Sequence, residues 1–278
     1  MVNERSGGIT TRNSRVQVGT DIFVVRIPAK GAGWLGIDRG IEHQASLLAA
    51  VRGIGPEVIY FLETEGVLVT RFIQGVPVSD ADVHLPGMLN RVAASLREIH
   101  HAGLVPAAFS PFRVVERYAS VARHQGVIVP AAFEAATAIA ADIEQALPVT
   151  APTLCHNDLL NANFIDDGER IRVVDWEYAA MGDPYFDLGN FAVNHGLAED
   201  EERHLLGAYA AVSSDASMAR LKLMRLMSDF REAMWGVVQQ AASELDFDFR
   251  AYAARHFERM LSGAADARFG RWLTQAGG

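Results

Sequence analysis

A polar run late in the chain constrains the fold more than any other part of the sequence. The run His156–Asn163 reads HNDLLNAN, and an acidic stretch, Asp175–Glu177, follows it after an apolar segment. Asp158 and Asn163 are five residues apart, so one loop can aim both side chains into the same cavity. A carboxylate, an amide and a second carboxylate in this order are typical of proteins that transfer a phosphoryl group.

The residues between the two acidic positions predict a β-hairpin. Residues 163–165 and 171–174 are apolar and strand-like, and residues 166–169 have the composition of a tight turn. Such a hairpin would return the chain so that Asp175 lies beside Asn163.

These three side chains predict a division of roles. Asp158 can accept the proton of an attacking hydroxyl group. Asn163 and Asp175 can hold Mg²⁺, which prefers oxygen ligands and needs few from the protein when ATP phosphates supply others. The alternative is an ordinary loop and hairpin with polar ends. The combined pattern favours phosphoryl transfer, with ATP and Mg²⁺ as cofactors.

Composition limits the partners that we expect. The chain has 278 residues, a formal net charge of −9 and one cysteine, Cys155. The negative charge argues against nucleic acid as a partner, because phosphate contacts dominate that affinity. One cysteine allows neither an internal disulfide nor a cysteine zinc site. The polar N-terminus and the lack of a long apolar run predict a cytoplasmic protein without membrane contact, and leave its oligomeric state open.

The first 75 residues are rich in predicted strands. Hairpins are expected at 16–27 and 58–73. A segment of glycines and small hydroxyl residues precedes the first of them, and there Gly8 and Thr11 could bring backbone N–H groups close to phosphates. A flexible N-terminal tail would have the same composition, so this segment alone is a weak indication.

A small lobe that binds ATP phosphates needs a strand cation paired with a helical acid. Arg26 lies within a predicted strand, and its planar guanidinium can bridge a phosphate and a carboxylate. Glu42, near the start of a helix expected at 38–52, is the predicted partner. The alternative is that both are charges on a solvated surface.

The rest of the chain is predicted to be mainly helical. Apolar residues recur at helical spacing from Leu85 to Ile99. Further helices are expected within 107–150 and at 199–211, 216–241 and 247–264. We therefore predict an α+β protein of two lobes, 1–75 and 76–278, with the nucleotide between them.

The segment 154–190 resembles the choline/ethanolamine kinases, which belong with the aminoglycoside phosphotransferases in a protein-kinase-like fold. Its matching stretches are 156–160 with Asn163, 174–179, Asp183-Pro184 and 186–190. The resemblance implies a small antiparallel-sheet N-lobe with one helix and a larger, mainly helical C-lobe. It also implies that Asp158 is the base and that Asn163 and Asp175 bind the metal.

The resemblance extends these assignments to neighbouring residues. The position of Glu177 implies that this side chain can also approach a metal. His156 and Asp187 are expected to brace the catalytic loop, although Asp187 could instead be a helix-start cap. The backbone groups of Arg71 and Ile73 are expected at the adenine edge.

The acceptor pocket matches the family only in part. A quaternary ammonium group needs aromatic faces and nearby negative charge. Trp235 matches one of two tryptophans of the family helix, and Glu232 stands in place of the other, where it could supply charge. Asn194 occupies the position of a glutamate that contacts choline in the family, and Leu160 occupies the position of a glutamine. Tyr185, with Tyr178, is a further candidate, and core packing is the alternative for Trp235.

The expected activity is Mg²⁺- and ATP-dependent phosphorylation of a small, cationic alcohol, choline or ethanolamine. Another amino alcohol or an aminoglycoside is the alternative acceptor. A nucleotide-binding pseudokinase is a second alternative, disfavoured because Asp158, Asn163 and Asp175 are all present. A metal-dependent hydrolase using His156 is weaker still, since nearby residues do not supply the further ligands that such sites need.

Overall fold

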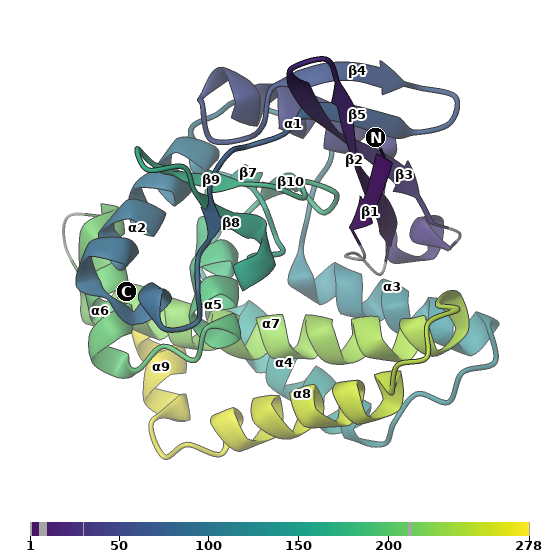
Figure 1. Ribbon diagram of the computed structural model, residues 1–278. Coiled ribbons are helices and arrows are strands. Elements are labelled where there is room, and N and C mark those ends of the chain that lie inside the picture. The colour runs from purple at the N-terminus through teal and green to yellow at the C-terminus, as the bar shows by residue number, and fades with distance from the viewer. Residues whose placement is uncertain (1, 6–9, 30, 211–212, 278) are drawn as a thin grey trace.

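The structure, a computed structural model, describes residues 2–5, 10–29, 31–210 and 213–277. Its N-terminal part is a five-stranded sheet in the order β1-β2-β3-β5-β4 with antiparallel pairing throughout. The strands are β1 (Val2–Arg5), β2 (Thr11–Val18), β3 (Asp21–Pro28), β4 (Val58–Leu62) and β5 (Val67–Arg71). Figure 1 shows this sheet above the helical part of the molecule, with helix α1 (Arg39–Val51) beside it.

Both predicted hairpins of this sheet are present, with two larger errors in length: β2 begins at Thr11 rather than at residue 16, and β5 is shorter than predicted. The β2–β3 hairpin turns at Gly19, whose φ of 61° is left-handed. The strand β5 was predicted to reach Ile73, but it ends at Arg71. Beyond this end, Gly75 lies so close to Asp166 that an added Cβ would be 2.5 Å from the Asp166 carbonyl oxygen.

The second part of the chain is mainly helical, as predicted. Its helices are α2 (Pro86–His100), α3 (Pro111–His124), α4 (Ala132–Ala146), α5 (Pro184–Asn194), α6 (Glu199–Ala210), α7 (Asp215–Ala242), α8 (Phe249–Ala264) and α9 (Phe269–Ala276), with short 3₁₀ turns at η1 (Ala32–Leu35), η2 (Asp82–His84) and η3 (Asn161–Asn163). The sequence did not predict α9. Among the helices that the structure describes, none has the length and apolar character that crossing a bilayer requires.

Helix α7 is the centre of the helical part. Figure 1 shows it running across the molecule between α3 and α8. Most of its residues from Ser217 to Gln239 are buried, and its apolar side chains form one core cluster with α3, α4 and α8. Buried charges interrupt this core at Asp229, Arg231 and Glu232. Charged side chains are seldom buried without partners, so we expect polar partners for these three residues within the helical part.

Two small sheets carry the predicted catalytic segment. β7 (Thr153–Cys155) pairs with β10 (Ala180–Gly182), and β8 (Phe164–Asp166) lies between β6 (Val76–Pro77) and β9 (Ile171–Val173). The predicted hairpin is therefore confirmed as β8–β9. Its turn is stabilised by Asp167, whose side chain accepts hydrogen bonds from the backbone N–H groups of Glu169 and Arg170 at 2.9 and 2.8 Å.

Candidate active site

The loop that follows β7 is held in place by helix α5. The carboxylate of Asp187 is fully buried and accepts hydrogen bonds from the backbone N–H groups of His156 and Asn157 at 2.8 and 2.7 Å. His100 Nε2 lies 3.1 Å from the same carboxylate. The alternative role for Asp187 is wrong, because α5 is capped by Asp183, whose side chain accepts from the Tyr185 N–H at 2.9 Å.

Asp187→Ala is expected to lower the free energy of unfolding by about 3–5 kcal/mol, because it leaves buried donors without their charged acceptor. Urea unfolding of the variant measures this loss. Asp183→Ala is the control on the same helix. It removes a cap and an ion pair with Arg220 and should cost about 1–2 kcal/mol. Equal losses in the two variants would contradict a bracing role for Asp187.

His156 is turned inward rather than toward a metal. Its Nε2 lies 3.0 Å from the Val174 carbonyl oxygen, and its Nδ1 accepts from the Asp158 N–H at 3.3 Å. Its ring packs edge-on against Trp176. Burial lowers the pKa of His156, so the ring is held neutral. With both ring nitrogens engaged, His156 supports the loop and offers no nitrogen to a hydrolytic metal.

The hairpin brings Asn163 and Asp175 toward the loop that carries Asp158. The amide of Asn163 donates to the Asp158 carbonyl oxygen at 2.8 Å, and the Val174 N–H donates to the Asn163 carbonyl at 3.0 Å. Asp175, the next residue, has a left-handed φ of 70°. Left-handed conformations are uncommon for residues other than glycine and often accompany functional sites. The three predicted side chains thus come from one loop and one hairpin that are bonded together.

Burial changes the acidity of Asp158. It raises the pKa of Asp158 to about 7, against the opposing effect of Arg231, while the negative charges of Glu232, Asp175 and Glu177 raise it further. A carboxylate with a pKa near neutrality is a better proton acceptor than one with an ordinary pKa. The interaction of Asp158 with Asp175 and Glu177 also shows that these acids share one region.

Cations from the small lobe meet these acids. Arg26 on β3 binds Glu42 of α1, with Nε 3.1 Å from Oε1, so the predicted pair is present. The same guanidinium donates to Asp175 and lies 4.0 Å from Glu177 Oε2. Arg39, which sequence reasoning missed, binds Glu42 at 2.6 Å and Glu177 at 3.1 Å. Its position one turn before Glu42 was the signal that could have identified it.

An all-oxygen donor set of Asn163, Asp175 and Glu177 fits Mg²⁺. Burial, and then the charge of Asp175, raises the pKa of Glu177 to about 7. The ion pairs of this cluster set three carboxylates, Glu42, Asp175 and Glu177, against the two guanidinium groups of Arg26 and Arg39, and this charge balance favours a bound cation. Thr10 completes the surroundings, since its hydroxyl donates to Glu177.

The structure describes only some of the other residues that were predicted to contact the nucleotide. Gly8 lies outside the described residues. Thr11 is buried at the start of β2. The Arg71 side chain binds Asp21 at 2.9 Å, and its backbone N–H donates to the Glu57 carbonyl at 2.8 Å. The contacts of Arg71 and Ile73 with adenine therefore stay predictions.

Part of the predicted acceptor pocket gathers around α7. The Trp235 Nε1–H donates to the Tyr178 hydroxyl at 3.0 Å. Glu232 accepts from the Tyr252 hydroxyl at 2.7 Å and from Arg231. Arg231 in turn lies 3.3 Å from Asp158 Oδ1, with its guanidinium 4.4 Å from the centroid of the Tyr178 ring. Sequence reasoning missed Arg231 and Tyr252.

Two acceptor candidates lie in other surroundings. Tyr185 packs beneath the Arg220 guanidinium, 4.0 Å from its ring centroid, and Arg220 binds Asp183. Asn194 donates to the Leu159 carbonyl at 3.3 Å, so it supports the loop beside the base. Their predicted contact with the acceptor stays untested.

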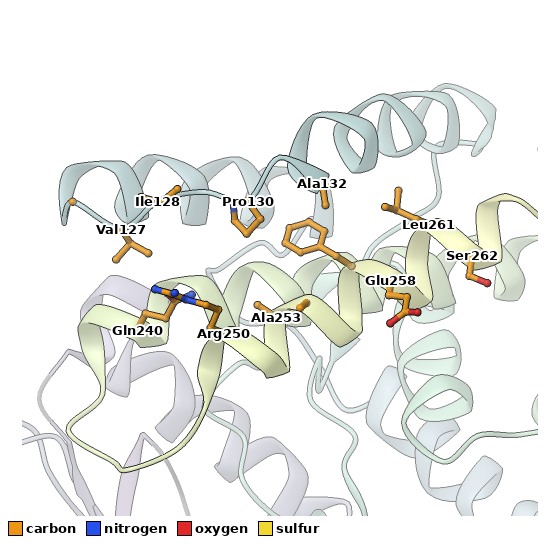
Figure 2. A pocket seen from close by; sticks show the side chains of 13 residues that line it. Val127, Ile128, Pro130, Ala132, Gln240, Arg250, Ala253, Glu258, Leu261 and Ser262 are labelled. Atoms are coloured by element: carbon orange, nitrogen blue, oxygen red, sulfur yellow. The ribbon is translucent and has the colours of Figure 1, made fainter.

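Size alone does not identify the site. Figure 2 shows a groove between α8 and the residues that precede α4. The volume of this groove is about 990 Å³. Its lining includes Val127, Ile128, Phe257 and Leu261, and none of the predicted site residues belongs to it. A smaller cavity of about 80 Å³ adjoins Glu177 and Tyr178. The chemistry of the side chains therefore locates the site better than cavity volume does.

The chain is similar to known proteins in both sequence and structure. The model of the phosphotransferase enzyme family matches residues 2–224. A choline/ethanolamine kinase family protein from Mesorhizobium loti has a TM-score of 0.85 and 31% identity, over 100% of this chain and 92% of that chain. Choline kinase LicA from Streptococcus pneumoniae has a TM-score of 0.82 and 25% identity, over 95% and 94%. Protein LicA of Haemophilus influenzae is 24% identical over 91% of this chain and 76% of that protein. These likenesses confirm the predicted protein-kinase-like fold.

Proposed function

We propose that this chain, which belongs to the phosphotransferase enzyme family, transfers the γ-phosphoryl group of Mg²⁺-bound ATP to the hydroxyl group of choline or ethanolamine. One observation carries the proposal. The base Asp158 is bonded through Asn163 to the hairpin that presents Asp175, and Arg26 of the small lobe binds that same carboxylate.

The residues divide the chemistry among them. Asp158 orients the acceptor hydroxyl and takes its proton as the new O–P bond forms. Arg26, which Glu42 holds in place, faces the phosphates. Arg26 and Arg39 together neutralise part of the phosphate charge. Asn163, Asp175 and Glu177 would hold the metal. When bound, Mg²⁺ neutralises charge that develops on the phosphate oxygens. Positioning and charge neutralisation then account for most of the rate.

The acceptor is the less constrained part of the proposal. Choline and ethanolamine are suggested by the names of the similar proteins and by Trp235, Tyr178 and Glu232, which meet near Asp158. A different small alcohol is the second candidate. It is favoured by Arg231, which already places a cation among those groups.

An assay of ADP release tests the proposal. With ATP, Mg²⁺ and a panel of small alcohols, we expect ADP release that requires both the metal and an acceptor. Chelation of the metal by EDTA is the control and should abolish the activity. Mg²⁺-dependent ATP binding without turnover on any alcohol would instead support a pseudokinase.

Three further assignments accompany this proposal. The lobes divide near residue 75, which is supported by the five-stranded sheet ending at Arg71 and by the pairing of β6 with β8. The backbone of Arg71 and Ile73 contacts adenine. The protein acts in the cytoplasm on a small molecule, without nucleic acid or membrane as a partner, which is supported by its composition.

A further inference from the structure

The groups that could surround an ammonium ion already surround a side chain. Arg231 is 1% exposed and lies between two carboxylates, with Nη1 3.3 Å from Asp158 Oδ1 and in contact with Glu232. Its guanidinium covers one face of the Tyr178 ring at 4.4 Å. Negative charge and an aromatic face are what a quaternary ammonium group seeks, and here both interactions are made by the protein's own cation.

The other members of the pocket are also engaged. Both carboxylate oxygens of Glu232 have partners, Arg231 on one and the Tyr252 hydroxyl on the other. Trp235 is 9% exposed, bonds Tyr178 through its N–H, and packs edge-on against Tyr252 and Phe249. A trimethylammonium group would therefore compete with Arg231 for the same acids and meet like charge.

Arg231 nevertheless keeps hydrogen-bonding capacity. Its Nε and Nη2 are buried and have no hydrogen-bond partner within the described part of the chain. Buried donors are costly when unpaired, so an oxygen of a bound acceptor that reached these N–H groups would be stabilised by them. An anionic group fits poorly, because Asp158 and Glu232 already flank the guanidinium. An uncharged oxygen is repelled neither by the guanidinium nor by these two carboxylates.

We infer that Arg231 determines acceptor specificity: the acceptor is an alcohol whose second functional group is an uncharged oxygen, such as a polyol hydroxyl, and not an ammonium group. This inference rests on the proposed phosphotransferase function, and within it favours the second acceptor candidate, a different small alcohol, over choline and ethanolamine. Glu232 positions Arg231, and Arg231 offers its free N–H groups to the acceptor oxygen.

The test compares acceptors that differ in this one group. Ethylene glycol replaces the ammonium of ethanolamine by a hydroxyl, and 3,3-dimethylbutan-1-ol replaces the charged nitrogen of choline by carbon. We expect kcat/KM for ethylene glycol to exceed that for ethanolamine by at least about tenfold, the size of one charged hydrogen bond. We also expect choline to be no better than its neutral isostere. Higher kcat/KM for ethanolamine or choline than for the neutral partner would overturn the inference.

Arg231→Met tests the residue itself. With the cation removed, Asp158 and Glu232 are free to attract an ammonium, so the kcat/KM ratio of ethanolamine to ethylene glycol should rise at least about tenfold. Arg225→Met is the matched control, an arginine of the same helix that binds the buried Glu202, and it should leave the ratio unchanged. If the role of Arg231 were purely structural, the substitution would lower kcat/KM equally for both acceptors, which would contradict the inference.

Two safeguards keep the outcomes separate. If Arg231→Met does not fold, the wild-type comparison still decides, and Arg231→Lys should keep the selection against ammonium while losing activity on ethylene glycol. Absence of ADP release with every alcohol, in a protein that binds ATP with Mg²⁺, would count against the phosphotransferase function. Turnover with a preference for ammonium acceptors would count against the role of Arg231 alone.

Discussion

Asp158→Asn is expected to lower kcat by about 10²–10⁴-fold, because an amide cannot take the proton of the attacking hydroxyl. The affinity for ATP should stay within about twofold, since the base faces the acceptor and not the nucleotide. Single-turnover ADP release measures the first quantity, and calorimetric titration with ATP and Mg²⁺ measures the second.

The fold should tolerate this substitution. Burial already disfavours the charged carboxylate at this position and raises the pKa of Asp158 to about 7, so a neutral amide of the same shape suits the surroundings. Asp167→Asn in the β8–β9 turn is the control and should keep its activity. Near-normal turnover in Asp158→Asn would remove the assignment of this residue as the base.

Asp175→Ala is expected to weaken ATP binding in the presence of Mg²⁺ by at least about 100-fold, because it removes one of the two carboxylates proposed to hold the metal. ATP binding without the metal should change in the opposite direction. The substitution removes a negative charge and releases the Arg26 guanidinium, which Asp175 binds in this structure. Titrations with ATP in Mg²⁺ and in EDTA measure both affinities.

Asp167→Ala is the control for this second substitution. It removes a carboxylate from the same hairpin but outside the acid cluster, so both affinities should be unchanged. A variant of Asp175 that keeps its Mg²⁺-dependent affinity would rule out this carboxylate as a metal ligand. Loss of affinity under both conditions would indicate damage to the fold, which thermal unfolding would reveal.

The catalytic segment was predictable from the sequence because its structure is local. The loop, the turn and the β8–β9 hairpin depend on residues close in the chain, and the place of Asp175 follows from strand pairing. The pairing of Arg26 with Glu42 was also predicted, through the resemblance. The end of β5 at Arg71 was not predicted, because the apolar pattern of the sequence continues to Ile73.

The acceptor region could be predicted only in part because it is tertiary. Trp235 and Glu232 were identified, but Tyr252 reaches Glu232 only through the packing of α8 on α7. Arg231 lies next to Glu232 in the sequence, and nothing in helical spacing says that its side chain turns toward Asp158.

The way in which α5 holds the catalytic loop has a consequence for how such enzymes diversify. Asp187 and Asn190 grip the loop through the main-chain N–H groups of His156, Asn157 and Leu159. Hydrogen bonds from the peptide backbone do not depend on which side chains the loop presents to the acceptor. New residues can therefore appear around the acceptor while the proton-accepting carboxylate keeps its place, so one scaffold can serve many alcohols.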